Sequence, residues 1–234
     1  RLAVFLSLAT LGAAMAPCRA GASADGLEPT AVPKVTPGNQ NLARIKLPPA
    51  PKIMVIPVND EETTRLGMID DWQAAFVARR LREAKREGYA LVILEIHTHG
   101  GDITSCEKIN KTIQNCGVPV IAFVRNMAFS GGALIALGCQ AIVMEPGAEV
   151  GGAQAVGADG ANLDADMREK ARSLLVAMMR GLSERNGYPE PLALGMVDQD
   201  IEVHETDDPQ HRFMTSVELE DWSAPARLRG PAPA

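Results

Sequence analysis

The chain has 234 residues, of which 46% are hydrophobic, and it carries a formal net charge of −6. A chain of this length and apolar content can bury one good core, so we expect one folded domain. The acidic balance and the lack of a basic stripe interleaved with aromatic residues argue against a nucleic-acid partner. The basic residues between Arg79 and Arg86 are interspersed with apolar positions, which indicates a solvated helix face.

The first 24 residues form an apolar stretch behind Arg1, followed by small residues. This pattern is typical of a secretory signal peptide and is too short for a membrane-spanning helix, which needs about 20 apolar residues. We therefore expect an exported protein, periplasmic or associated with a membrane. Residues 25–51 contain six prolines and show little periodicity, which predicts an extended linker.

A folded domain is expected over residues 52–200, where strand and helix patterns alternate. The β-rich runs lie at 52–58, 91–96, 118–124 and 141–144, and helical patterns lie at 69–84, 103–114 and from Ser130 onward. This alternation predicts an α/β fold with a mostly parallel sheet and flanking helices. Ligands of such sheets bind beyond the carboxyl ends of the strands. Residues 201–222 predict a β-hairpin with an acidic turn and then a helical turn, and 223–234 predict a disordered tail.

Two loops leave the carboxyl ends of neighbouring predicted strands. The first contains Gly100 and Gly101, whose backbones adopt conformations closed to other residues and let a substrate approach their N–H groups. The second presents Ser130 at a helix N-terminus, beside the N–H of Gly131. An ordinary strand-to-helix turn explains the first loop alone. Together the loops predict a serine nucleophile, an oxyanion hole formed by Gly101 and Gly131, and substrate contacts at Gly100 and Gly132.

The nucleophile needs a proton acceptor, and the chain offers a lysine or a histidine. Lys170 is the only lysine C-terminal to Ser130, and it opens a helical stretch with one apolar flank. A lysine acts as a general base only when burial or a like charge lowers its pKa, so the dyad requires this flank to bury Lys170. A lysine on an amphipathic helix otherwise faces solvent.

An α/β-hydrolase would instead order its triad as serine, acid and histidine, here Ser130, Asp198 and either His204 or His211. Those histidines lie in a polar tail. In addition, the position two before the serine is Ala128, where that fold usually has glycine. The lysine is therefore the favoured base.

Several segments of the chain match the motifs of one protein family and occur in the same order as in that family. They are HTHGG at 97–101, AFSGGALIAL at 128–137, MEPGAEVGGA at 144–153, the helix with Lys170, GLSERNG at 181–187 and GMVD at 195–198. Through these segments, residues 52–200 resemble the membrane-associated NfeD serine proteases, which have the Clp-protease-like fold. This fold is related in shape to that of crotonases and is built of repeated ββα-type units.

The resemblance implies a serine endopeptidase with a Ser130–Lys170 dyad that cleaves extended, apolar polypeptide segments through an acyl-enzyme. It implies no metal or organic cofactor, a polypeptide substrate, and a stomatin-like membrane protein as partner. We also expect a homo-oligomer, a dimer or larger. No convincing metal-ligand set is present, because His97 and His99 lack a third partner.

The chain also departs from these relatives. His97 and His99 stand where the family's glycine loop has aspartate and proline. The Clp protease subunit has a triad histidine near the position of Ala153, but this chain has no histidine between His99 and His204, so that triad cannot be transferred. Two other classes stay open: a crotonase-like acyl-CoA hydratase or hydrolase, which export argues against, and a catalytically inactive scaffold.

Three cysteines follow the predicted signal peptide, namely Cys106, Cys116 and Cys139. An odd number in an exported chain leaves at least one without an intramolecular partner. We expect buried free thiols, since free cysteine packs as a small apolar side chain.

Overall fold

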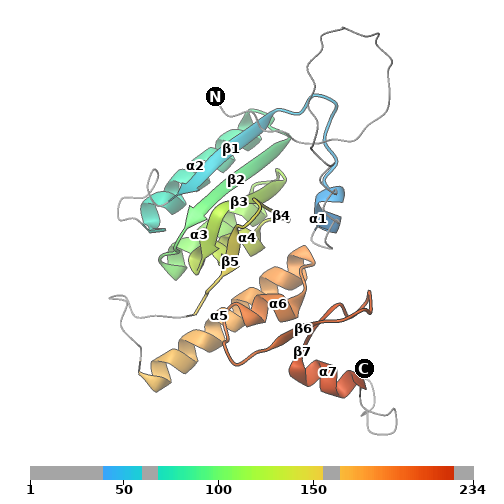
Figure 1. The fold of residues 1–234 in the computed structure, drawn as a ribbon. Coiled ribbons are helices and arrows are strands. Elements are labelled where there is room, and N and C mark those ends of the chain that lie inside the picture. Colours follow the sequence, from blue (N-terminus) through green and yellow to red (C-terminus); the bar gives the residue numbers. More distant parts are fainter. Residues whose placement is uncertain (1–38, 60–67, 155–163, 224–234) are drawn as a thin grey trace, which may run out of the picture. The chain divides into compact units, whose positions relative to one another are not determined.

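The structure is a computed structural model that describes residues 39–59, 68–154 and 164–223 (Figure 1). The predicted signal peptide and the C-terminal tail from 224 onward lie outside the described residues. In the parts that the structure describes, no helix is both long and apolar enough to cross a membrane.

A five-stranded parallel sheet forms the centre of the domain (Figure 1). Its strands are β1 (Ile53–Asn59), β2 (Leu91–Thr98), β3 (Val120–Phe129), β4 (Ala141–Met144) and β5 (Glu149–Gly151). The order is β1-β2-β3-β4, and β5 pairs with the end of β3. The α/β fold with a mostly parallel sheet, predicted from the alternation of elements, is confirmed.

In the described part of the chain, three helices connect strands of this sheet, and two more follow β5. They are α2 (Asp71–Arg86), α3 (Ile103–Asn115), α4 (Gly131–Gly138), α5 (Ala165–Asn186) and α6 (Glu190–Gly195). The Asp70 carboxylate accepts from the Gln73 N–H and thereby caps α2, and Asp102 caps α3 in the same way through Ser105. Every residue of α4 is buried, since this helix contacts β3, α3 and α5.

The two faces of the sheet bury different clusters. One face packs alternate residues of β1, β2 and β3, such as Ile56, Leu94 and Val124, against α2, α3 and α4 in the main core. The other face holds the smaller cluster of Leu91, Ile93, Ile121 and Ala141. Alternation of side chains along each strand accounts for this division.

The segment predicted as an extended linker has structure where it is described. The short helix α1 (Asn39–Ala43) contacts β4, and Leu42, Ile45 and Leu47 pack on the smaller cluster of the sheet. The expectation of an extended chain is therefore wrong for residues 39–43, which are helical, and three apolar side chains between residues 42 and 47 pack on one face of the sheet. Its extent before residue 39 lies outside the described residues.

The strand before Ser130 is longer than predicted. An apolar run up to Val124 predicts a strand end there, but β3 continues through Arg125 and Asn126 to Phe129. The continuation has its own partner, because Met127–Phe129 pair with β5 after β4 has ended opposite Val124. This second pairing carries β3 directly to Ser130.

The C-terminal segment forms the antiparallel pair expected of it. Strands β6 (Val203–Glu205) and β7 (Phe213–Thr215) form this pair, and α7 (Ser216–Ser223) follows at once. The buried Met214 anchors β7, whereas α7 has no buried residue.

Candidate active site

Ser130 lies at a sharp, strained turn between β3 and α4. Its backbone has φ 50° and ψ −117°, and no other non-glycine residue of the described ranges has a positive φ. Such conformations cost about 1–3 kcal/mol and persist only where the surroundings enforce them. Here the Ser130 N–H donates to Gly151 O of β5 at 2.9 Å, and its carbonyl accepts from the Ala133 N–H at 3.0 Å. The turn therefore holds a half-buried serine in a fixed, strained orientation.

The glycine loop after β2 lies directly against this serine. Thr98 Oγ1 accepts from the Gly100 N–H at 3.0 Å and thereby tightens the loop. Gly100 has φ 116°, and a Cβ on it would lie 2.6 Å from Ser130 Cβ and 3.0 Å from Ser130 Oγ. Only glycine fits this position. The structure thus brings together the two loops that the sequence predicts at one edge of the sheet.

Gly101 is fixed by a bridge to the segment before α2. The Ile69 N–H donates to Gly100 O, and the Asp102 N–H donates to Ile69 O, both at 2.8 Å. A Cβ on Gly101 would lie 2.2 Å from Ile69 O. Backbone atoms of Ile69 therefore leave no room for a side chain on Gly101, and hydrogen bonds on either side of Gly101 fix the loop against Ile69.

Gly131 is the first residue of α4, where the backbone N–H has no acceptor within the helix. A Cβ on Gly131 would lie 3.3 Å from the Gly101 nitrogen and 2.5 Å from Cys106 Sγ. The Gly101 nitrogen and Gly131 are thus neighbours next to Ser130. Two N–H donors beside a serine stabilise the oxyanion of acyl transfer, and this role of Gly101 and Gly131 stays a prediction.

Gly132 has a packing role in addition to the predicted substrate contact. A Cβ on it would lie 2.6 Å from Thr98 Cγ2 and 3.5 Å from Ala128 Cβ. Gly132 therefore lets α4 approach the ends of β2 and β3. Its contact with substrate stays a prediction.

Lys170 differs from the expectation in its surroundings. It lies on α5 as predicted, but the helix begins at Ala165, and the side chain of Lys170 is exposed rather than buried. Among the residues that the structure describes, it makes no hydrogen bond or ion pair, including none with Ser130. The reason is that the buried side chains of α5 start only at Leu175, so its first turns extend past the core.

The residues of the alternative histidine triad have other partners. Arg172 Nη1 donates to Asp198 Oδ2, His204 Nε2 lies 2.9 Å from Ser216 Oγ, and His211 Nδ1 lies 3.1 Å from Asp208 Oδ2. Neither histidine is joined to Asp198. The structure does not form the α/β-hydrolase triad.

The three described cysteines are buried free thiols, as expected. Cys106 lies under Gly131, and burial raises the pKa of its thiol to about 12. Burial also raises the pKa of the Cys139 thiol. At neutral pH both are unreactive packing residues, so neither competes with Ser130 as nucleophile.

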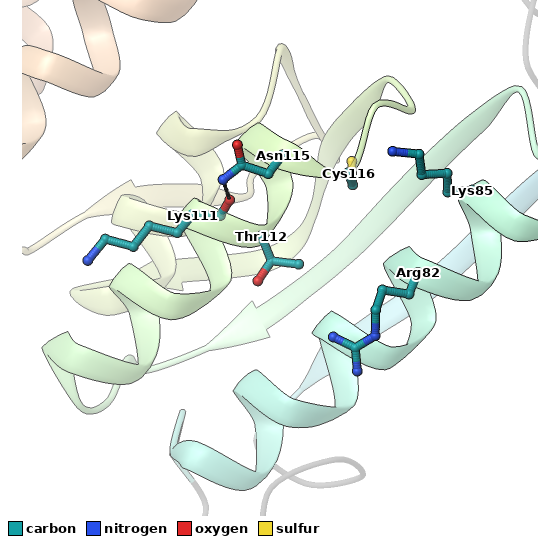
Figure 2. A pocket seen from close by; sticks show the side chains of 6 residues that line it. All are labelled: Arg82, Lys85, Lys111, Thr112, Asn115 and Cys116. Atoms are coloured by element: carbon teal, nitrogen blue, oxygen red, sulfur yellow. Dashed lines mark hydrogen bonds between the residues drawn. The ribbon is translucent and has the colours of Figure 1, made fainter.

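A basic groove lies away from this site (Figure 2). It has a volume of about 380 Å³ and is lined by Arg82, Lys85, Lys111, Thr112, Asn115 and Cys116. These residues lie at the C-terminal ends of α2 and α3, whereas the glycine loop adjoins the N-terminal ends of the same helices. The helix dipole favours cations at such ends, which explains the charge of the groove without a ligand.

Comparisons with known proteins agree with the fold. A family model described as the NfeD1b N-terminal domain matches residues 52–221. The membrane protein NfeD1b of Bacillus subtilis (strain 168) is 36% identical over 163 residues, which cover 70% of this chain and 35% of that protein. Membrane-bound protease PH1510 of Pyrococcus horikoshii is 26% identical over 143 residues, covering 58% and 32%. The chain thus spans about a third of the length of these relatives.

Two solved structures of the 1510-N membrane-bound stomatin-specific protease share the fold, each with a TM-score of 0.56. One is a lysine-to-alanine mutant in complex with a substrate peptide. It is 20% identical and covers 75% of this chain and 74% of that chain. The other is a serine-to-alanine mutant, 21% identical, covering 74% and 76%. At this identity the likeness establishes the fold.

Proposed function

Because the chain belongs to the NfeD1b N-terminal domain family, we propose that it is a serine peptidase with a Ser130–Lys170 dyad. The observation that carries the proposal is the strained Ser130, enclosed by Gly100, the Gly101 nitrogen and the first N–H of α4. Strain of this kind gathers at active sites, where it presents a nucleophile.

The proposed reaction is cleavage of an extended, apolar polypeptide segment. Neutral Lys170 accepts the proton of the Ser130 hydroxyl while Oγ attacks the peptide carbonyl carbon. The N–H groups of Gly101 and Gly131 hold the oxyanion. The C–N bond then breaks, the leaving amine takes the proton from Lys170, and water releases the acyl group from Ser130. In this proposal the bound segment covers Lys170 and excludes water from it.

The mutants of the 1510-N protease support both roles. The substituted serine and lysine of that protein are separated by nearly the same number of residues as Ser130 and Lys170 here. We further propose a stomatin-like membrane protein as partner, membrane association and a homo-oligomer, a dimer or larger. The 1510-N protein is described as stomatin-specific, and both curated relatives are named as membrane proteins.

One observation favours a second candidate, a catalytically inactive scaffold. Lys170 is exposed and is not hydrogen-bonded to Ser130, whereas a working general base lies within hydrogen-bond reach of its proton during the reaction. Apo sites often tighten only with substrate, so the two candidates predict different chemistry rather than different resting geometry.

A fluorophosphonate probe distinguishes the candidates. We expect labelling of the wild-type chain, none of Ser130→Ala, and labelling of Lys170→Ala slowed by about 100-fold or more, the usual contribution of a general base. Circular dichroism of each variant controls for folding. Equal labelling of all three proteins contradicts the dyad, and labelling of none supports the scaffold.

A further inference from the structure

Asp198 is a buried carboxylate to which the proposed reaction gives no role. It is 6% exposed and lies in the segment between α6 and β6. Asp198 Oδ1 accepts from the Asp200 N–H at 3.0 Å, and Oδ2 accepts from Arg172 Nη1. Arg172 is half-buried on α5, two residues after Lys170, and its Nε also donates to Glu169 at 3.0 Å. A carboxylate buried this deeply needs such a cation, because an unpaired charge there is costly.

The pair joins the part of α5 that the core does not hold. The buried residues of this helix, Leu175, Met179, Leu182 and Ser183, all follow Arg172. Its C-terminal end is fixed further, because Asn186 Nδ2 donates to Leu137 O at 2.7 Å. Residues 164–170 are exposed. The Arg172–Asp198 pair therefore ties the half of α5 that carries Lys170 to the domain.

The segment that contains Asp198 is also linked to the turn that holds Ser130. Met196, two residues before Asp198, accepts from the Ala153 N–H at 2.8 Å. Ala153 follows β5, whose Gly151 carbonyl accepts from the Ser130 N–H at 2.9 Å. A short run of backbone hydrogen bonds thus links Asp198 to the strained turn, and the ion pair extends it to α5.

We propose that Asp198, acting through Arg172, is a positioning residue. It fixes the position, relative to Ser130, of the helical turn of α5 that carries Lys170. The proposal rests on the proposed Ser130–Lys170 dyad. Misplacement of a catalytic group by about 1 Å can cost as much as 100-fold in rate, so loss of the pair slows the chemical step. Asp198 does not touch the reacting atoms, and substrate binding stays unchanged.

The chain offers a matched control on the same helix. Arg180 Nε lies 2.6 Å from Glu190 Oε1, so this second ion pair joins α5 to α6, three turns further from the N-terminus of α5 than Lys170. Like the Arg172–Asp198 pair it joins an arginine of α5 to a carboxylate, but the Glu190 carboxylate is exposed whereas that of Asp198 is buried. Its loss leaves the Lys170 turn in place.

The test is the kinetics of inactivation by a fluorophosphonate, measured as the maximal rate kinact and the half-saturating concentration KI. We expect Asp198→Asn and Arg172→Gln to lower kinact by about 10- to 100-fold with KI unchanged. Arg172→Lys recovers part of the rate, and Arg180→Gln keeps the wild-type kinact. A purely structural role would lower the folded fraction without this separation of kinact from KI.

The outcomes separate this inference from the proposed function. A wild-type kinact in folded Asp198→Asn, or an equal loss in Arg180→Gln, overturns the positioning role while the dyad stands. A wild-type chain that the probe does not label overturns the dyad and the positioning role with it. Where a single variant fails to fold, Arg172→Gln combined with Asp198→Asn removes both charges and gives the same comparison.

Discussion

The two halves of the proposed dyad are held in different ways. Ser130 lies in a strained turn with its N–H bonded to β5 and with Gly100 packed against its side chain. Lys170 lies on an exposed part of α5 that precedes the buried stripe of that helix. The nucleophile and its oxyanion groups are thus preorganised by backbone packing. The proposed base depends on the Arg172–Asp198 ion pair and on the polypeptide segment that covers it when bound. The two regions therefore respond differently to mutation.

The largest effect is expected at Gly101, in the fixed region. Gly101→Ala places a Cβ against the backbone O, N and Cα atoms of Ile69, which cannot move aside as a flexible side chain can. We expect a loss of more than about 3 kcal/mol in the free energy of unfolding and no probe labelling. Denaturant unfolding measures the loss of stability. The control is Gly181→Ala on α5, where a Cβ meets nothing within 4 Å and helix stability rises by about 0.5–1 kcal/mol.

Alkaline pH tests the burial of Cys106 under Gly131. Burial raises the pKa of this thiol from its ordinary value of 9.0 to about 12, so its contribution to stability is full below pH 9 and is lost as the pH rises towards 12. At pH 10 the unfolded thiol ionises and the folded one does not, which costs about 1 kcal/mol. Urea unfolding between pH 8 and 10 should show a shallower fall for Cys106→Ala than for the wild-type chain. Equal slopes would contradict the burial.

Replacement of the nucleophile should reveal the strain at φ 50°. Ser130→Gly and Ser130→Ala both remove the hydroxyl, but only glycine adopts this conformation freely. We expect the glycine variant to be the more stable of the two by about 1 kcal/mol, as measured by thermal unfolding. A more stable alanine variant would show that the turn is not strained.

The smallest change in stability is expected at Lys170. Its side chain is exposed, so Lys170→Ala should alter the free energy of unfolding by no more than about 0.5 kcal/mol. The same variant should be labelled by the probe about 100-fold more slowly than the wild-type chain. A loss of stability above 1 kcal/mol would indicate that Lys170 packs in the native state, and the contrast between the two halves of the dyad would then fail.

Much of the fold could be predicted because its elements have clear local patterns. The apolar runs that became β1, β2 and β4 are short, and Asp70 and Asp102 cap the helices between them. The far end of β3 could not be predicted. Arg125 and Asn126 interrupt its apolar run, and only pairing with the distant β5 makes it a strand.

The site shows the same division. A serine among small residues and a glycine pair after a strand indicate two loops at one edge of a parallel sheet, since strand ends meet there. That Gly100 contacts Ser130, and that Gly132 packs on Thr98, depends on how two loops far apart in sequence fold against each other. The exposure of Lys170 could not be predicted either, because an apolar flank on α5 does not say where along the helix burial begins.

Local sequence patterns were enough to predict the alternating elements, the parallel sheet and the residues at its carboxyl edge, because these follow from periodicity and from turn-forming residues. Tertiary structure decided the strain at Ser130, the neighbouring positions of the Gly101 nitrogen and Gly131, and the pairing of Asp198 with Arg172. These features arise from contacts between segments that are distant in the chain. No local pattern carries that information.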